Sequence, residues 1–275
     1  MTVPESPPAG KLLIQKVDDV AQRRGIVLLL IGPSGAGKTT LLATLNPAKT
    51  LVYDVDGGCA ALRSAGWNGA IVEAPKDMAN IRAFVEMVTL GEHGYATVCI
   101  DTVSAIERRM TFALADLRKR EFLDVRDYGD SSSKLRQYLI ALRDASARGT
   151  NIIFVSHEAT DLKGAEGQVF PMLSQKLARE LLGWCDIVGR LTVGPGGERS
   201  LSFAPAVNTC TKTRFRSIDT GADEKLDLGD IFRRIAAEMG KPMPAAAKPA
   251  KAEKPAATPE TTVIAAPAPA PTPAK

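Results

Sequence analysis

The sequence contains few of the residues that build metal centres or covalent cross-links. Among its 275 residues there are four cysteines and two histidines. Zinc sites and disulfide frameworks need closely spaced ligands or paired cysteines, and no Cys-x-x-Cys pattern occurs. We therefore predict neither kind of site and interpret the cysteines as reduced thiols. They are Cys59, Cys99, Cys185 and Cys210.

Long hydrophobic runs are also missing. The longest aliphatic run, Ile26–Ile31, has six residues, whereas a membrane-spanning helix needs about 20. The proline-rich start, Met1–Gly10, lacks the apolar segment of a secretory signal. We therefore expect a cytoplasmic protein that has no membrane partner.

Aromatic residues are absent from the C-terminal segment, residues 241–275. This segment holds nine of the 18 prolines and twelve alanines, with five lysines against two glutamates. Such a composition cannot bury enough apolar surface to offset the entropy cost of ordering the chain. The sequence thus predicts an N-terminal extension over residues 1–19, one core domain over residues 20–240 and a disordered tail over residues 241–275.

Within the core, short apolar runs alternate with longer segments of helical periodicity. This alternation predicts an α/β fold with a mostly parallel, twisted sheet flanked by helices. The expected strands are Ile26–Ile31, Leu51–Asp54, Thr97–Asp101, Asn151–Ser156 and Asp186–Val193. The expected helices are Lys38–Leu45, Asp77–Thr89, Ser104–Arg120, Ser131–Ala147, Met172–Gly183 and Leu228–Met239. Gly194-Pro195-Gly196-Gly197 predicts a turn that adds Arg199–Phe203 as an antiparallel edge hairpin.

A phosphate-binding loop follows the first expected strand. Gly32-Pro33-Ser34-Gly35-Ala36-Gly37-Lys38-Thr39 matches the G-x-x-x-x-G-K-[ST] pattern and opens a helix that continues with Thr40. Backbone N–H groups of such a loop cradle phosphates, and the lysine reaches the outer phosphate oxygens. We expect these nine residues to bind a nucleoside triphosphate and Thr39 to ligate Mg²⁺; a glycine-rich turn without a ligand is the alternative.

Acidic residues end two further expected strands. Asp101 follows the apolar run Val98–Ile100 and fits a carboxylate that holds the Mg²⁺ shell; helix capping is its alternative role. The residue after Asp101 is Thr102, which is not an acid. The acid that activates water must therefore come from another part of the chain. We expect the Tyr53-Asp54 strand to lie beside the phosphate loop, with Asp56 as catalytic base and Asp54 supporting the metal. A turn role for Asp56 is the alternative.

His157 follows the apolar strand that ends at Ser156. A polar group at that carboxyl end can sense the outermost phosphate of a bound nucleotide. The alternative is a surface or capping histidine.

The order of these motifs resembles the RecA-like ATPase core. Tyr53–Gly58 and Phe154–Glu158 look more narrowly like the RecA-like nucleotide-binding proteins of bacteriophages, which include a Sak-type group of single-strand annealing proteins. This resemblance implies Mg²⁺-ATP as cofactor, a homo-oligomer in ring or filament form, and Lys212 and Arg214 reaching the nucleotide of a neighbouring subunit. It also implies location in the bacterial host cytoplasm and a single-strand-binding or other replication protein as a further partner.

The same resemblance implies that single-stranded DNA binds two loops, which would be Phe122–Ser133 and Glu158–Phe170. Residues 108–148 carry ten Lys or Arg against six acids, so DNA phosphates could be neutralised there. The alternative is that these charges only solvate helix faces. Tyr128 could stack on a base or pack.

Two other functions remain open, and two more classes are disfavoured. A nucleotide-dependent switch that binds a protein partner without DNA is the main alternative, and a small-molecule kinase is a weaker one. A GTPase is disfavoured because the chain has no Asn-Lys-x-Asp motif to recognise guanine. A transporter ATPase is disfavoured because the chain has no Leu-Ser-Gly-Gly-Gln signature.

Overall fold

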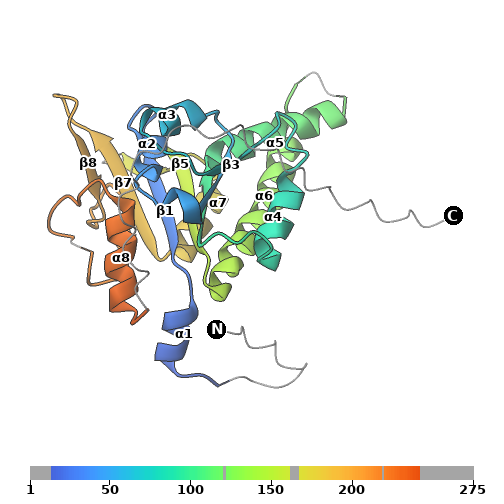
Figure 1. Ribbon diagram of the computed structural model, residues 1–275. Coiled ribbons are helices and arrows are strands. Elements are labelled where there is room, and N and C mark those ends of the chain that lie inside the picture. Colours follow the sequence, from blue (N-terminus) through green and yellow to red (C-terminus); the bar gives the residue numbers. More distant parts are fainter. Residues whose placement is uncertain (1–13, 120–121, 162–166, 219, 242–275) are drawn as a thin grey trace.

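A nine-stranded sheet forms the centre of the molecule. The computed structural model describes residues 14–119, 122–161, 167–218 and 220–241 (Figure 1). The strands run in the order β3-β2-β4-β5-β1-β7-β8, with β6 paired to β5 and β9 to β7. Their bounds are β1 Val27–Gly32, β2 Thr50–Asp54, β3 Ala70–Glu73, β4 Thr97–Asp101, β5 Asn151–Asp161, β6 Gln168–Pro171, β7 Ile187–Val193, β8 Arg199–Ser202 and β9 Lys212–Thr213.

The central strands are parallel, whereas β6, β8 and β9 pair antiparallel with their neighbours. The register places Gly32 opposite His157 and Asp54 opposite Asp101. Because parallel strands all end at one edge, the functional candidates gather there. The mostly parallel sheet with antiparallel edge strands confirms the predicted fold class, and the hairpin around Gly194–Gly197 is confirmed as well.

Helices cover both faces of the sheet (Figure 1). α4, α5, α6 and α7 bury one face together with Leu29 and Phe154. α2, α3 and α8 pack on the other face, against Leu28 and Ile153. The helix bounds are α1 Val17–Arg23, α2 Lys38–Leu42, α3 Cys59–Ser64, α4 Ile81–Leu90, α5 Val103–Leu117, α6 Val125–Ala145, α7 Gln175–Trp184 and α8 Leu228–Glu238. Short 3₁₀ turns occupy Pro47–Lys49 and Ser146–Arg148.

The β1 strand explains why the centre is stable. All six of its residues are buried, as expected of a strand covered on both faces. Burying one such Leu or Ile side chain contributes about 1.5–3 kcal/mol. This strand therefore forms a rigid base for the loop that follows it.

One expected neighbour relation is wrong. We placed the strand that ends at Asp54 beside the phosphate loop, but β1 pairs with β5 and β7, and β2 lies beyond β4. Alternation of apolar runs predicts strands without predicting their order in the sheet. The residues after Asp54 still reach the loop by a different route, described below.

The predicted loop Phe122–Ser133 is also wrong over most of its length, because α6 begins at Val125. The side chain of Asp124 accepts hydrogen bonds from the backbone N–H groups of Arg126 and Asp127. In return, the side chain of Asp127 accepts one from the backbone N–H group of Asp124. This capping box starts the helix early. Ser131, which we interpreted as a loop residue, is buried and bonds Thr111.

The second predicted loop, Glu158–Phe170, is a hairpin in its described part. Glu158–Asp161 continues β5 and pairs with β6, so strand pairing extends beyond the apolar run; residues 162–166 lie outside the described residues. The predicted extension and tail lie largely outside them too, and the domain limits stay predictions. No helix in the described ranges is long and apolar enough to cross a membrane.

Candidate active site

The phosphate loop connects β1 to α2 in the expected conformation. Gly35 and Gly37 have φ values of 78° and 97°, a region that favours glycine. The Nζ atom of Lys38 donates hydrogen bonds of 2.8 Å to the carbonyl oxygens of Gly32 and Pro33. The lysine is thus folded over the loop that should hold a phosphate.

Burial tunes the charge of Lys38. Desolvation lowers the pKa of its ammonium group, while Asp101, Glu158 and Asp56 act in the opposite direction. A cation that has lost part of its water interacts more strongly with an anion. The site therefore favours an incoming phosphate.

Asp101 and Thr39 form the pair expected of a magnesium site. Thr39 Oγ1 donates to Asp101 Oδ2 over 2.6 Å. Burial raises the pKa of Asp101 to about 6, and the Thr39 hydrogen bond works against that rise. Asp101 Oδ1 is buried with no partner among the described residues, so an acceptor remains for a water of a metal shell.

Within the described ranges no cluster of three His, Cys, Asp or Glu residues could hold a metal alone. Mg²⁺ usually keeps several waters and shares substrate phosphates instead of occupying an all-protein cage. The Thr39–Asp101 pair fits that mode of binding.

Asp54 has a different role from the metal ligand that we expected. Its carboxylate accepts hydrogen bonds of 2.9, 2.8 and 3.1 Å from the backbone N–H groups of Gly57, Gly58 and Cys59. A carboxylate engaged by three N–H groups organises the turn after β2. Asp54 therefore positions the turn that carries Asp56, and both of its carboxylate oxygens are engaged there.

That turn brings Asp56 to the site even though β2 is not adjacent to β1. The N–H groups of Val55 and Asp56 both donate to the carbonyl oxygen of Asp101, which folds the turn over the end of β4. A Cβ atom on Gly58 would lie 2.7 Å from Thr39 Cγ2, so glycine permits the close approach. Asp56 Oδ2 then accepts from Thr102 Oγ1 over 2.9 Å.

His157 joins the parts of the site. Its Nδ1 atom lies 3.4 Å from Lys38 Nζ, and its Nε2 atom lies 3.3 Å from Asp56 Oδ2. Its backbone N–H donates to Ser104 Oγ. The candidate base, the phosphate-loop lysine and the histidine are therefore contiguous.

Comparison with known proteins agrees with this geometry. The family model described as an AAA domain matches residues 24–215. The chain belongs to this family. It is an ATP-binding P-loop ATPase domain, and the predicted P-loop ATPase class is confirmed.

Two individual proteins are similar to this AAA-domain protein. An uncharacterized ABC transporter ATP-binding protein of Methanocaldococcus jannaschii is 27% identical over 190 residues, which cover 62% of this chain. The chain spans 60% of the length of that relative. The crystal structure of the RadB recombinase matches 68% of this chain and 84% of its own at 17% identity, with a TM-score of 0.42.

Lys212 and Arg214 lie at the opposite end of the sheet from the phosphate loop. β9 pairs with the start of β7, at Ile187 and Val188. Arg214 Nη1 binds Asp186 Oδ1 over 3.0 Å, and burial lowers the pKa of Lys212. The AAA-domain protein does not bring these two residues to its own nucleotide site, so their action on a neighbouring subunit stays a prediction.

Sequence reasoning missed Arg199 of β8. Its Nε atom donates to the carbonyl oxygen of Ala36 over 2.9 Å, which places a cation against the phosphate loop. A residue that starts an edge strand carries no motif, so only the fold of the hairpin shows this contact. Thr102 and Ser104 were missed as well, although they connect Asp56 to His157.

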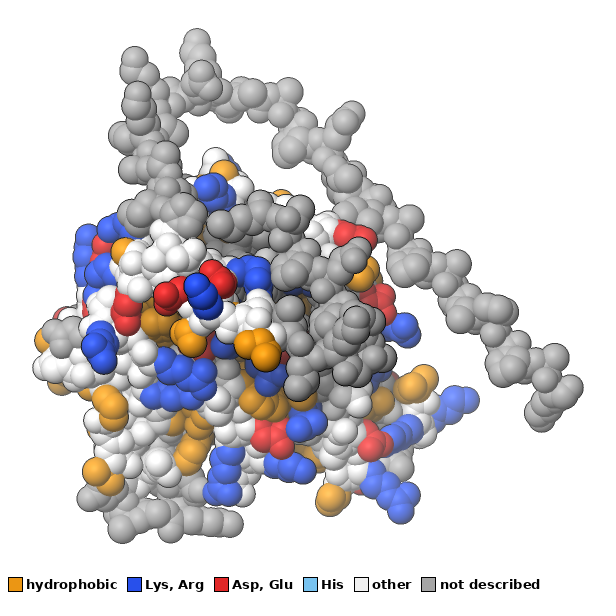
Figure 2. Space-filling model, turned by 90° about the horizontal axis from the view of Figure 1, so that it is seen from below, with side chains coloured by type: hydrophobic (Ala, Val, Ile, Leu, Met, Phe, Trp, Pro, Cys, Tyr) orange, Lys and Arg blue, Asp and Glu red, His pale blue; other side chains and the backbone are white. Residues whose placement is uncertain are grey.

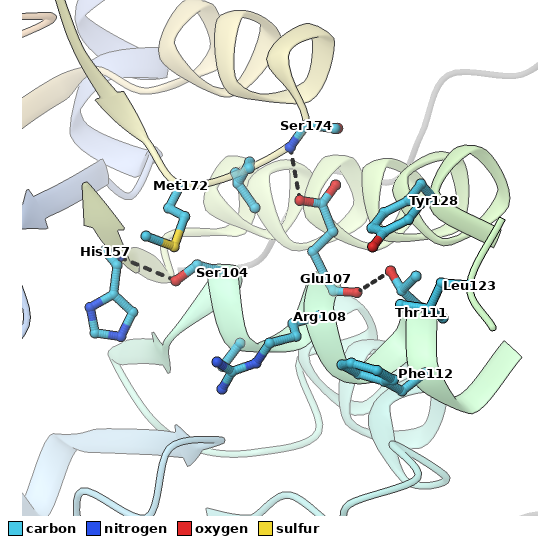
Figure 3. A pocket seen from close by; sticks show the side chains of 12 residues that line it. Ser104, Glu107, Arg108, Thr111, Phe112, Leu123, Tyr128, His157, Met172 and Ser174 are labelled. Carbon is cyan, nitrogen blue, oxygen red and sulfur yellow. Dashed lines mark hydrogen bonds between the residues drawn. The ribbon is translucent and has the colours of Figure 1, made fainter. Parts of the chain in front are cut away.

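A cavity of about 420 Å³ adjoins the nucleotide site of the AAA-domain protein. His157 and Ser104 line it from the nucleotide side, and residues of α5, α6 and the segment before α7 form the other walls (Figure 3). The size lies in the range of about 300–1,000 Å³ that small-molecule sites have. The two sites therefore share a wall.

Proposed function

We propose that this protein hydrolyses ATP with Mg²⁺ and couples hydrolysis to single-stranded DNA in phage-type recombination or strand annealing. The observation that carries the proposal is the continuous contact from Lys38 through His157 to Asp56, beside a cavity that His157 also lines. Such an arrangement can report the state of the nucleotide to a second ligand.

Asp56 is the proposed base. Its carboxylate can accept the proton of a water that attacks the outermost phosphate, and the hydroxyl of Thr102 fixes its orientation. RecA-like proteins commonly have Glu at this position, and Asp is one methylene shorter. Turnover is therefore expected to be slow.

His157 and Lys38 have complementary parts in the same scheme. Lys38 compensates the charge of the phosphate oxygens. His157 contacts both the lysine and the base, so it can respond to the presence of the phosphate. Thr39 and Asp101 would hold Mg²⁺, which supplies further charge compensation when bound.

The DNA part of the proposal rests more on the cavity than on the count of basic residues. Several arginines of residues 108–148 are engaged in ion pairs: Arg118 with Asp127 and Asp130, Arg136 with Glu180, and Arg143 with Asp144. Their charge is partly compensated within the protein. Support for DNA comes from the half-exposed aromatic residues at the cavity, because bases stack on such side chains.

A nucleotide-dependent switch that binds a protein partner is the second candidate. The same exposed apolar side chains favour it, since apolar patches mark protein interfaces too. To separate the two, single-stranded DNA binding is measured with and without ATP at several salt concentrations. A DNA ligand should lose affinity steeply with salt. Absence of binding at low salt would contradict the DNA role and leave the ATPase intact.

Assembly is a further part of the proposal. A homo-oligomer could place Lys212 and Arg214 at a neighbour's nucleotide, although Arg214 would first have to leave Asp186. Measuring the molar mass by light scattering with ATP, with ADP and without nucleotide tests this. A monomer under every condition would contradict a role across subunits; a single-strand-binding or other replication protein remains a proposed partner.

A further inference from the structure

The cavity beside His157 has a carboxylate in its wall. Glu107, on α5, accepts the backbone N–H of Ser174 through Oε2 over 2.8 Å (Figure 3). Its Oε1 atom is buried with no partner among the described residues. A buried acceptor without a donor costs free energy, and a small shift of the half-buried Glu107 side chain into the cavity that it lines would let a ligand supply the N–H group.

The rest of the cavity suits a flat apolar body. Phe112, Tyr128 and Met172 line it, and they remain 53%, 55% and 50% exposed. Large apolar side chains left half in water gain when a ligand covers them. Tyr128 and Glu107 line the same cavity (Figure 3), so one bound ring can contact both the aromatic side chain and the carboxyl group.

A cation is available beside the cavity for an anionic ligand. Arg108 lines the same space and is exposed. The combination of stacking surface, buried acceptor and nearby guanidinium matches the parts of one nucleotide, namely a base with an N–H group and its phosphate.

We propose that this cavity holds one base of a single DNA strand and prefers a base with an exocyclic amino group, which donates to Glu107 Oε1. This inference rests on the proposed action on single-stranded DNA. A carboxyl oxygen of Glu accepts well from the N4 amino group of cytosine. Thymine has a single N–H group flanked by two carbonyl oxygens, whose lone pairs repel the carboxylate.

Occupation of the cavity can be felt at the nucleotide. Ser104 lines the cavity and bonds Thr102 Oγ1 over 3.0 Å, and Thr102 in turn bonds Asp56. His157 provides the second connection, because it lines the cavity and contacts Asp56 directly. A DNA base bound against these side chains therefore restrains Asp56, which we assign as the proton acceptor in hydrolysis.

The test compares oligo(dC) with oligo(dT) of equal length. Binding to the full chain is measured by fluorescence anisotropy with a non-hydrolysable ATP analogue and Mg²⁺. We expect oligo(dC) to bind about tenfold more tightly, the equivalent of about 1.4 kcal/mol. In Glu107→Gln the preference should fall to about twofold or reverse, because the amide can also donate to a thymine carbonyl.

Matched variants distinguish this site from general effects. Glu92→Gln changes an exposed glutamate in the turn after α4 and should keep the wild-type preference. Tyr128→Ala should weaken both oligomers by about tenfold, whereas Leu90→Ala, an exposed apolar truncation elsewhere, should weaken neither. If Glu107→Gln does not fold, the Tyr128→Ala and Leu90→Ala pair decides the question.

Two negative results have different meanings. If neither oligomer binds wild-type protein at low salt, the proposed action on DNA is overturned and this inference falls with it. If both oligomers bind equally well and neither Glu107→Gln nor Tyr128→Ala changes that, the DNA role stands and the base site is overturned.

Discussion

The two ends of the sheet use similar residues in opposite ways. At the amino end, Asp186 Oδ2 accepts the backbone N–H of Val27, and Asp186 Oδ1 binds Arg214. At the carboxyl end, Asp101 is equally buried, but only Oδ2 has a partner and Oδ1 has none among the described residues. A fully bonded carboxylate holds the fold together, whereas a partly bonded one is available for a ligand.

The basic side chains at the two ends of the sheet show the same contrast. Figure 2, which views the molecule of Figure 1 from below, shows many Lys and Arg side chains interspersed with acidic and hydrophobic ones. Arg24, Arg143 and Arg214 belong to this end and pair with Asp144 or Asp186. Lys38 at the other end contacts carbonyl oxygens and a histidine instead. A charge count alone does not separate these two uses.

The largest effect is expected from Lys38→Ala. Removing the ammonium group takes away charge compensation that exists mainly in the transition state, so ATP turnover should fall by about 10²–10³-fold. Steady-state phosphate release measures it. Lys49→Ala removes an exposed lysine outside the site and should leave turnover unchanged. Full turnover in Lys38→Ala would mean that the catalytic end has been misassigned.

Asp56→Asn should have the next largest effect. The amide cannot take a proton from water but keeps the size of the side chain, so hydrolysis should slow by about 10²-fold while ATP still binds. Nucleotide binding and single-turnover hydrolysis are measured separately. The control is Asp116→Asn, which alters an exposed acid of α5. Equal rates in Asp56→Asn and wild type would remove the role of Asp56 as base.

Asp186→Ala should damage the fold and leave the chemistry unaffected. It leaves the Val27 N–H group buried without a partner, which costs about 1–3 kcal/mol of unfolding free energy. Urea unfolding measures that loss, and the KM for ATP should stay at the wild-type value. A raised KM with unchanged stability would contradict the division of the sheet into a structural end and a catalytic end.

The contrast between the ends also explains how much the sequence could predict. The strand that ends at Gly32 and the glycines after it specify the phosphate loop locally, since motif and backbone conformation are properties of adjacent residues. Asp101 and His157 could be predicted because each directly follows or ends a buried strand, and parallel strands end together.

Strand order, by contrast, depends on contacts between distant segments. For that reason the predicted position of the Asp54 strand beside β1 was wrong. The role of Asp54 likewise became visible only from its three backbone N–H partners. Arg199 reaches Ala36 across 163 positions of sequence, and no local pattern encodes such a contact. Asp124 did carry a local signal, the capping box, which the following glycine and serines obscured.

The last effect concerns the pH dependence of stability. Burial raises the pKa of Asp101 to about 6, above the value of about 3.9 for a free Asp. Below a pH of about 4, the Asp101 carboxyl group is protonated in both the folded and the unfolded state. Between a pH of about 4 and about 6, the folded state keeps this proton, whereas the unfolded state has lost it. The unfolding free energy should therefore decrease as pH rises from about 4 to 6, by about 2 kcal/mol.

Urea unfolding of metal-free protein over that pH range measures this decrease, and Asp101→Asn, which does not titrate, should show a smaller one. Mg²⁺ with ATP should reduce the slope as well, because a bound cation favours the ionised carboxylate. Asp186→Asn serves as the comparison at the other end of the sheet. If it, and not Asp101→Asn, removes the slope, then the carboxyl group responsible for the slope lies at the amino end and the contrast between the two ends is reversed.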